Sequence, residues 1–367
     1  MDRYQRQRIL PEVGEEGQKK LRASSVLIVG AGGLGSPCAI YLASAGVGRL
    51  GLVDFDQVDI SNLHRQILYT QHDIGSSKLS VAKIKLKALN PDVCVDLYET
   101  RLTSDNAFDI LKTYDVIVDG TDNFQTRTLV NDACFFLKKP NVYGSIFKFE
   151  GQVSVFDARL GPCYRCLYPE ISSLGLIPNC AEGGVLGVLP GVVGTLQATE
   201  TLKLLLGIGK PLIGKLLYFD ALSMKFGEMS FYKRKECPLC GKFPTTRIAC
   251  LQKQEEVCGS EADVQALSVF ELKKQLDGGN CISLLDVREG FEREIVQLKS
   301  HHIPLGELPH RWRELDLASD LVVYCHHGGR SQSAVNFLKK QGFKNVKNLK
   351  GGIDAWVCHI DPELSRY

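Results

Sequence analysis

The clearest hydrophobic pattern begins at Ser25, where a short aliphatic run, Val26 to Val29, enters a glycine-rich turn. A segment compatible with a helix follows and ends at Gly46, and a second apolar run ends at Asp54. Strand, turn, helix and strand in this order predict a β-turn-α-β unit, from which parallel sheets are built.

Further apolar runs extend this unit. Strands are predicted at 93–98 and 115–119, with a helix at 78–89 between them. After Gly151 the pattern changes to one typical of antiparallel strands around a long loop and one helix; these strands are expected at 152–157, 216–220 and 226–232. The fold class is therefore α/β, with a Rossmann-like, mostly parallel sheet.

A second domain is predicted behind a linker. Residues 243–263 lose periodicity and are largely polar, as in a connecting segment. Beyond them, helix and strand patterns alternate again, with helices at 269–276 and 331–341 and strands at 282–287 and 321–324. We expect a first domain over 1–242, a linker over 243–263, and a smaller α/β domain over 264–367.

Composition narrows the functional classes. The chain has 367 residues, 44% of them hydrophobic, and a net charge of +2, which suits globular domains and gives no excess positive charge for nucleic acid. The first ten residues lack the apolar core of a signal peptide, and no uninterrupted apolar run of about 18 residues would span a membrane. We expect a cytoplasmic protein whose thirteen cysteines are reduced and bind metal or carry chemistry.

The turn after the first predicted strand contains a candidate nucleotide-binding motif. Residues 30–35, Gly-Ala-Gly-Gly-Leu-Gly, match GxGxxG between a strand and a helix, and Asp54 follows about 20 residues later. Glycines let backbone N–H groups approach a phosphate, and the carboxylate accepts hydrogen bonds from ribose hydroxyls. The pattern alone does not distinguish NAD from ATP, and a tight turn without ligand is the structural alternative.

The polar residues that follow Asp54, the residue expected to bind the ribose, favour ATP over NAD. Arg65 follows Asn62 closely, and Lys78 opens the predicted helix, so two cations flank one phosphate site. Asp122 and Asn123 end a buried strand, where a carboxylate suits Mg²⁺. The alternatives are a solvated basic face for the cations and a helix cap for Asp122.

Together, VGAGGLGSP, SNLHRQ, the lysine of GSSKLSVAK and GTDN resemble the MoeB/ThiF/HesA family, relatives of ubiquitin-activating enzymes, over residues 3–242. The resemblance implies adenylation of the C-terminal glycine of a ubiquitin-like sulfur-carrier protein (MoaD/ThiS-like), with Arg65 and Asp122 catalytic. It implies an arginine, here Arg6, that reaches the neighbouring subunit's ATP site; with the apolar segment 185–206 this predicts a homodimer. The implied nucleotide-binding residues are Arg6, Gly32, Gly33, Asp54, Ser61, Asn62, Leu63, His64, Arg65, Lys78, Asp122 and Asn123.

Two CxxC pairs predict a metal site. Cys163 with Cys166, and Cys237 with Cys240, supply four thiolates, which suit a closed tetrahedral Zn²⁺ site of structural type. A redox CxxC normally stands alone at a helix start, so redox chemistry is the weaker alternative. The family resemblance also implies this zinc.

Cys180 lies in a loop bounded by Gly183 and Gly184 and belongs to no metal pair. Lone cysteines are usually small apolar core residues. In family members that combine activation with sulfur transfer, however, a cysteine at the matching place links covalently to the activated carrier or resolves its acyl persulfide. We therefore assign Cys180 a catalytic role as a hypothesis.

The second domain contains its own reactive cysteine. Cys325 follows a predicted buried strand, and the residues after it, HHGGRS, lead into a predicted helix. Successive backbone N–H groups of this loop and the helix N-terminus would stabilise a thiolate. This spacing, with LDVRE at 285–289 and GGIDAW at 351–356, resembles the rhodanese sulfurtransferases over 264–356. The resemblance implies a persulfide on Cys325; a cysteine-dependent phosphatase and an inactive rhodanese are the alternatives.

The two halves predict one pathway. ATP adenylates the carrier's C-terminal glycine, and sulfur from the Cys325 persulfide replaces AMP to leave a thiocarboxylate; a cysteine desulfurase or thiosulfate would supply the sulfur. Attack by the persulfide first and formation of a Cys180 thioester first are equally compatible with the sequence. The rivals are an NAD-dependent oxidoreductase and a protein that adenylates or only docks ubiquitin-like folds without sulfur transfer.

Overall fold

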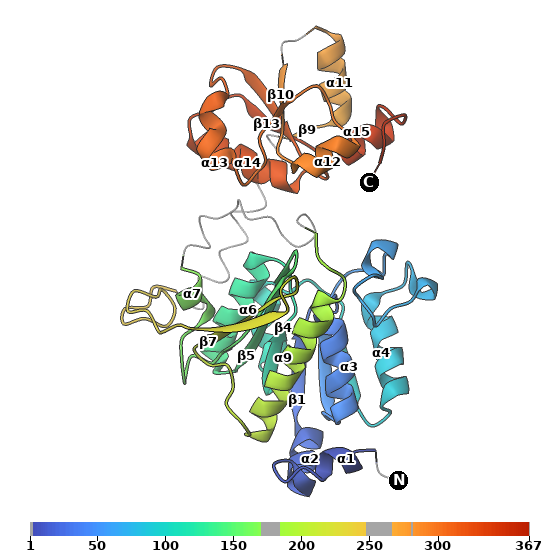
Figure 1. The fold of residues 1–367 in the computed structure, drawn as a ribbon, viewed down its shortest axis with the longest axis vertical. Helices are drawn as coiled ribbons and strands as arrows, with labels where there is room; N and C mark the ends of the chain where they lie inside the picture. Colours follow the sequence, from blue (N-terminus) through green and yellow to red (C-terminus); the bar gives the residue numbers. More distant parts are fainter. Residues whose placement is uncertain (1–2, 170–183, 247–265, 280–281, 367) are drawn as a thin grey trace. The chain divides into compact units, whose positions relative to one another are not determined.

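The computed structural model describes residues 3–169, 184–246, 266–279 and 282–366 (Figure 1). The described residues up to 246 form one compact unit, and those from 266 onward form a second.

The first unit is built on an eight-stranded sheet in the order β3-β2-β1-β4-β5-β6-β7-β8. The pairs among β1 to β5 are parallel, and from β5 to β8 each strand pairs antiparallel with the next. This confirms the predicted change of pattern after Gly151. The strands are β1 Ser25–Val29, β2 Arg49–Val53, β3 Cys94–Tyr98, β4 Val116–Asp119, β5 Asn141–Phe147, β6 Glu150–Phe156, β7 Lys215–Asp220 and β8 Lys225–Ser230.

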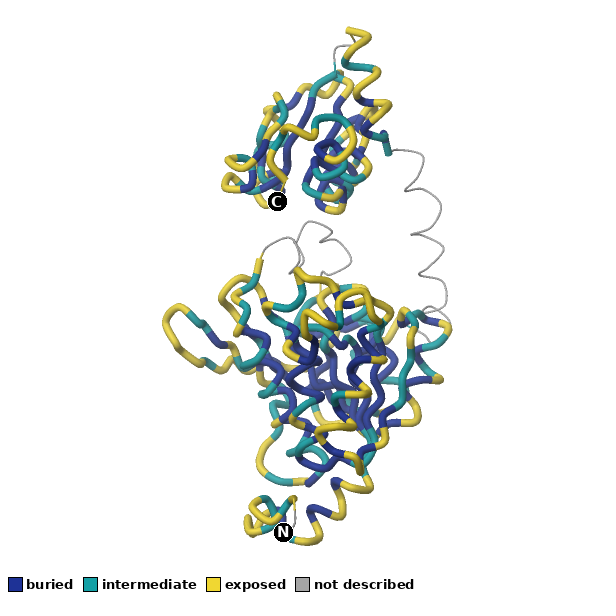
Figure 2. The backbone as a smooth tube through the Cα atoms, turned by 90° about the vertical axis from the view of Figure 1, so that its right-hand side faces the viewer, coloured by how far each residue is buried: buried dark blue, intermediate teal, exposed yellow. Residues whose placement is uncertain are grey.

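Helices cover both faces of this sheet, because successive side chains of a buried strand point to opposite sides. Val26 and Ile28 of β1 pack into one buried cluster with α3, α4 and α9, whereas Leu27 and Val29 pack into another with α5 and α6. Figure 2 shows that the buried residues of this unit, in dark blue, lie in its interior. The helices are α1 Gln5–Arg8, α2 Gly14–Ala23, α3 Gly35–Ala45, α4 Lys78–Leu89, α5 Ser104–Leu111, α6 Phe124–Leu137, α7 Tyr164–Leu167 and α9 Leu189–Leu206, with short 3-10 turns η1 Ile60–Asn62 and η2 Gln71–Asp73.

The apolar helix α9 is a core helix of this unit. Leu189 and Val193 are fully buried in a cluster with β6 and β7. The Gln197 side chain donates from Nε2 to the backbone oxygens of Asp119 (2.8 Å) and Val142 (3.0 Å), so its amide nitrogen is satisfied inside the unit. Contacts within the chain thus account for the buried part of 185–206, while Leu186 and Val188 are exposed, and the homodimer stays a prediction. Among the described helices, none is both long enough and apolar enough to cross a bilayer.

The second unit has a five-stranded, wholly parallel sheet in the order β11-β10-β12-β13-β9. Leu285 and Val323 face one buried cluster while Leu284 and Val322 face the other, so the central strands are buried on both sides. The smaller α/β fold is confirmed. Its elements are β9 Ala266–Leu267, α11 Val269–Asp277, β10 Ile282–Asp286, α12 Gly290–Ile295, β11 His301–His302, α13 Leu308–Arg311, η5 Trp312–Glu314, β12 Asp320–Tyr324, α14 Gly329–Lys340, β13 Val346–Leu349 and α15 Gly352–His359.

Candidate functional site

A cavity of about 270 Å³ lies at the carboxyl ends of β1 to β4. From β1 the sheet order continues to β2 on one side and to β4 on the other, and such a switch point is where open α/β sheets bind ligands. The cavity brings together eight of the residues predicted for the nucleotide: Gly32, Gly33, Asp54, Asn62, Arg65, Lys78, Asp122 and Asn123.

The glycine loop forms one wall of this cavity, and its geometry requires glycine. Gly30 has φ of +91°, and a β carbon there would lie 2.9 Å from the Gly120 carbonyl oxygen. A β carbon on Gly35 would lie 1.9 Å from the Gly30 oxygen. The loops after β1 and β4 therefore approach at backbone distance, which no side chain would permit.

Two of the carboxylates that line the cavity, Asp54 and Asp122, differ in their surroundings. Asp54 follows β2 and is anchored, because it accepts hydrogen bonds from the backbone N–H groups of Ala31 (2.8 Å) and Asp56 (2.9 Å). Asp122 is exposed and lines the cavity. The residue that caps α6 is Asn123, whose side chain accepts from the Thr126 N–H at 2.9 Å. Asp122 is thus not the helix cap that the alternative interpretation required.

Two of the cations that line the cavity, Lys78 and Arg65, are held by an acidic and a backbone group respectively. Lys78 opens α4 with its side chain only 5% exposed, and its Nζ lies 2.9 Å from Asp56 Oδ2. Arg65 donates from Nη1 to the Ser61 carbonyl oxygen at 2.8 Å. Basic side chains outnumber acidic ones in the lining, which favours a polyanion such as a triphosphate. The charged lining residues are Arg65, Lys78, Arg101 and Arg127, with Asp54, Asp56 and Asp122.

Sequence reasoning missed Arg127, which lines the cavity from the first turn of α6. It is buried and donates from Nε and Nη2 to the Thr121 carbonyl oxygen at 3.2 and 2.9 Å. Asp119, at the end of β4, accepts from the Thr121 N–H and hydroxyl, and burial raises its pKa while Arg127 opposes that shift. These two residues hold the loop that carries Asp122. The signal in the sequence was the spacing of Arg127 four residues after Asn123, which places both on one face of a helix.

Some predicted residues lie outside the cavity lining. Ser61 is exposed and its N–H donates to Asp59, whereas Leu63 is partly buried against the core. His64 is exposed, and its Nδ1 lies 3.0 Å from the Ser61 oxygen. Arg6 is exposed in α1. Cys180 lies outside the described residues.

The four metal-spaced cysteines come together in the first unit. Their sulfur atoms all lie within 4.8 Å of one another, with Sγ–Sγ distances of 3.9 Å (Cys163–Cys166), 3.6 Å (Cys163–Cys237) and 3.3 Å (Cys166–Cys240). Four sulfurs that are each about 2.3 Å from a tetrahedral Zn²⁺ are separated by about 3.8 Å. The cluster therefore fits a zinc ion.

Neighbouring groups fix the first CxxC pair. Arg165 lies between its two cysteines and donates from Nε and Nη2 to the fully buried Asp132, with Nη2–Oδ2 at 2.7 Å. The Tyr164 N–H donates to Asn131 at 2.8 Å. These bonds tie the segment that carries Cys163 and Cys166 to α6.

The Cys325 loop in the second unit has the geometry of a thiolate site. The Cys325 sulfur is buried and accepts from the Gly328 N–H at 3.1 Å and the Ser331 hydroxyl at 3.3 Å. Gly328 has φ of +102° and precedes α14, so the loop curls around the sulfur and leads into a helix N-terminus. This arrangement stabilises a negative charge on sulfur.

Two buried ion pairs support this loop. Arg330 and Glu292 form a bidentate pair, with nitrogen–oxygen distances of 2.5 and 2.6 Å. Asp286 and Arg288 are both fully buried and also pair through two hydrogen bonds, of 2.9 and 2.6 Å. The geometry of this second pair is that of a pair that stabilises the fold.

Comparisons with known proteins match both units. Residues 4–239 match the model of the ThiF family, and residues 268–359 match that of the rhodanese-like domain. Over 264 residues the chain is 54% identical to the sulfur carrier protein adenylyltransferase of Thermus thermophilus, covering 71% of this chain and 97% of that protein. It is 44% identical to the probable adenylyltransferase/sulfurtransferase MoeZ of Mycobacterium tuberculosis, covering 100% of this chain and 95% of that protein. It is 40% identical to the adenylyltransferase and sulfurtransferase MOCS3 of Culex quinquefasciatus, covering 100% and 89%.

Among solved structures, Escherichia coli MccB with succinimide is similar with a TM-score of 0.59 at 23% identity. The match covers 66% of this chain and 75% of that chain. At this identity the likeness supports the fold of the first unit.

Proposed function

The chain belongs to the ThiF family and carries a rhodanese-like domain, and we propose that it activates and then sulfurates the C-terminal glycine of a ubiquitin-like sulfur-carrier protein. It is a bifunctional adenylyltransferase and sulfurtransferase. The observation that carries the proposal is the presence, in one chain, of a cation-lined cavity at a sheet switch point and of a thiolate loop around Cys325.

The first reaction transfers AMP from ATP to the carrier. A carboxylate oxygen of the terminal glycine attacks the α-phosphorus, and the bond to pyrophosphate breaks. Both reactants are negative, so Arg65 and Lys78 screen the approach and stabilise the charge that develops on the leaving group. Asp54 accepts from the ribose hydroxyls, and Gly32 and Gly33 admit the phosphates.

Mg²⁺ suits the same cavity. Asp122 is an exposed carboxylate that lines it, and Asn123 lies beside Asp122, so oxygen donors suited to this ion are available. When bound, Mg²⁺ neutralises charge on the phosphates. Arg127 and Asp119 act as positioning residues, because they hold the loop on which Asp122 lies.

The second reaction replaces AMP with sulfur. The terminal sulfur of a Cys325 persulfide attacks the acyl carbon, AMP leaves, and an acyl persulfide remains on Cys325. The Cys180 thiolate then attacks Cys325 Sγ, which releases the thiocarboxylate and forms a Cys180–Cys325 disulfide that an external thiol reduces. In the alternative order, Cys180 first takes the acyl group as a thioester.

The rival functions differ in a simple assay. Exchange of labelled pyrophosphate into ATP, dependent on a ubiquitin-like carrier and unaffected by NAD, would support adenylation. ATP binding without exchange would favour a docking protein, and NAD binding in preference to ATP would favour an oxidoreductase.

Several finer features are part of the proposal. Zinc in the four-cysteine cluster is structural, because four thiolates leave no open position. Thiosulfate or a cysteine desulfurase supplies the sulfur, and a cytoplasmic location would keep the thiols reduced. The functional boundaries are 1–242 and 264–367.

The homodimer is proposed because Arg6 is exposed and lies outside the cavity of its own chain. If Arg6 acts in the partner's site, mixing Arg6→Ala chains with Asp122→Ala chains restores some adenylation, since one site per dimer then has both groups. Fully active monomers in light scattering would exclude this arrangement.

A further inference from the structure

Three side chains with metal-ligand atoms meet next to the Cys325 loop. His326 and His327 follow Cys325 directly, and Asp354 lies in the first turn of α15. One ligand atom from each of the three lies within 4.8 Å of those of the other two. None of these residues belongs to the four-cysteine cluster.

The distances are close to those of a bound transition metal. The two imidazole rings stack with centroids 3.8 Å apart, and His327 Nδ1 lies 3.7 Å from Asp354 Oδ2. Nitrogen and oxygen ligands at about 2.0–2.2 Å from a tetrahedral Zn²⁺ are separated by about 3.3–3.6 Å. A small rotation of the exposed His327 side chain would close this difference.

The backbone holds the two ligand-bearing segments together. The Asp354 N–H donates to the His326 oxygen at 3.1 Å, and the Ile353 N–H donates to the Cys325 oxygen at 2.9 Å. Gly352 has φ of +61°, and a β carbon there would lie 2.2 Å from the His326 oxygen. The ligands therefore sit on a fixed frame, which reduces the ordering cost of binding an ion.

Charge and exposure also suit a cation. The His327 side chain is 67% exposed, His326 is half-buried, and the Asp354 side chain is 17% exposed. The Asp354 carboxylate supplies negative charge at the cluster, and Arg366 pairs with it. Arg366 Nε lies 2.7 Å from Asp354 Oδ1 and thus competes with a metal for the same carboxylate.

We propose that His326, His327 and Asp354 form a second metal site, which binds Zn²⁺ and inhibits sulfur transfer at Cys325 when it is occupied. Two imidazoles and a carboxylate are a donor set that Zn²⁺ accepts, and three protein ligands leave one position open. Zinc also binds sulfur, so an ion with an open position beside the loop competes for the terminal sulfur of the persulfide or of the donor. The inhibitory role rests on the proposed sulfurtransferase function, whereas the binding site does not.

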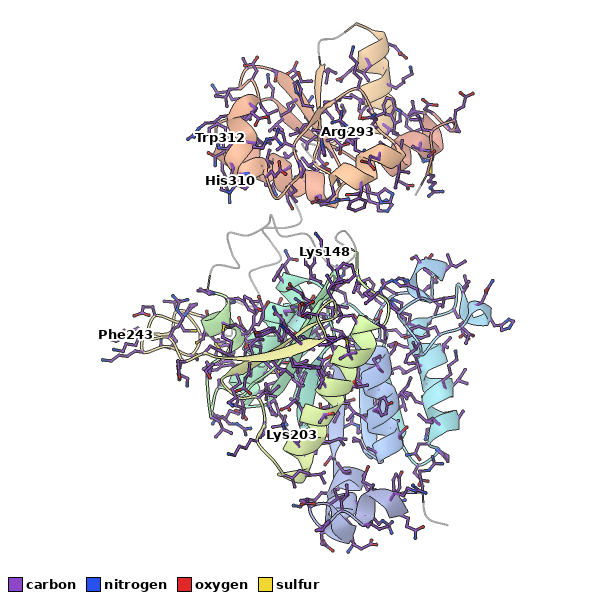
Figure 3. All side chains as sticks on the ribbon, in the orientation of Figure 1. Lys148, Lys203, Phe243, Arg293, His310 and Trp312 are labelled. Atoms are coloured by element: carbon purple, nitrogen blue, oxygen red, sulfur yellow. The ribbon has the colours of Figure 1, made fainter. Side chains whose placement is uncertain are left out.

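The test uses untagged full-length protein that retains the zinc of its cysteine cluster and has been dialysed free of weakly held metal. Equilibrium dialysis against labelled Zn²⁺ should find one additional equivalent in wild type. His327→Ala should weaken it by at least about 100-fold, since loss even of an outer-shell partner costs 10–100-fold. His310→Ala, an exposed histidine of α13 in the same unit (Figure 3), is the matched control and should bind as wild type does.

Two further variants sharpen the assignment. Arg366→Ala should tighten binding, because Asp354 loses its competing partner, and Cys325→Ser should still bind the ion. Any one of four results would overturn the site. The first two are the absence of the additional equivalent in wild type, and its binding by His327→Ala as tightly as by wild type. The other two are its loss in Cys325→Ser, and an unchanged affinity in Arg366→Ala.

The effect of zinc on sulfur transfer is measured separately from zinc binding. Thiosulfate:cyanide sulfurtransferase activity should fall over the Zn²⁺ range in which the additional equivalent binds, and His327→Ala should resist this loss. Binding without inhibition would overturn the regulatory role. If wild type had no sulfurtransferase activity without added zinc, the proposed function would fail while the dialysis result stood.

Discussion

Glu292 is the residue whose loss should separate the two activities most cleanly. Its carboxylate accepts both terminal nitrogens of Arg330, and the side chains are only 5% and 4% exposed. The same carboxylate accepts from the Glu289 N–H at 2.9 Å in the capping box of α12. Glu292→Ala therefore removes a buried ion pair and a helix cap together.

The expected loss follows from these contacts. Breaking a buried ion pair by removing one partner costs about 3–5 kcal/mol, and loss of a cap about 1 kcal/mol more. A domain of this size has a free energy of unfolding of about 5–15 kcal/mol, and each kcal/mol shifts its Tm by about 4–8 °C. The second unit should thus melt at least roughly 16 °C lower.

The assay compares Glu292→Ala with two other variants of the full chain by calorimetry. Glu292→Gln keeps an oxygen for the Glu289 N–H but loses the charge, so its Tm should fall by an intermediate amount. Glu294→Ala, an exposed position on the same helix, should change stability by less than about 0.5 kcal/mol. Thiosulfate:cyanide activity should fall with the Tm of the second unit, and pyrophosphate exchange should persist. Equal melting temperatures for Glu292→Ala and Glu294→Ala would refute the reasoning.

Four other outcomes are expected. Asp122→Ala should abolish carrier adenylation but keep thiosulfate:cyanide activity; adenylation at the wild-type rate would remove Asp122 from the site. Arg65→Ala should lower kcat for adenylation by about 10²–10³-fold, and a change confined to KM would contradict a role in the transition state. Cys163→Ser should release zinc and lower the Tm of the first unit, whereas full zinc content by metal analysis would count against the site. A hydrogen bond from Lys85 lowers the pKa of Asp73 to about 2, so their pair stabilises the fold above about pH 4 and does so less as the pH falls towards 2. An NMR titration of Lys85→Ala should show the pKa of Asp73 moving back towards 3.8. An unchanged pKa would exclude the pair as the cause of the shift.

The sequence predicted those parts of the fold and site that local rules determine. The helix predicted at 78–89 is α4 with the same bounds, because Ser77 caps it and apolar residues recur at helical spacing. Asp54, Lys78 and Asp122 gather at the cavity because the loops after parallel strands meet at one edge of a sheet.

The remaining features depend mainly on tertiary packing. Arg127 and Asp119 both bind Thr121, and they do so only once α6 is placed after β4. Within the apolar segment 185–206, Leu189 and Val193 are buried in their own unit whereas Val188 is exposed, a division that the apolar composition alone does not show. Asp354 reaches His327 only because β13 leads the chain back beside β12.

The most direct test is intact-mass spectrometry of a ubiquitin-like sulfur carrier incubated with this enzyme, ATP, Mg²⁺ and thiosulfate. Wild type should convert the carrier's C-terminus to a thiocarboxylate, and Cys325→Ala should stop at the acyl adenylate. A thiocarboxylate formed by Cys325→Ala at the wild-type rate, or a carrier left unmodified by wild type across the candidate carriers, would contradict the assignment of both reactions to this chain.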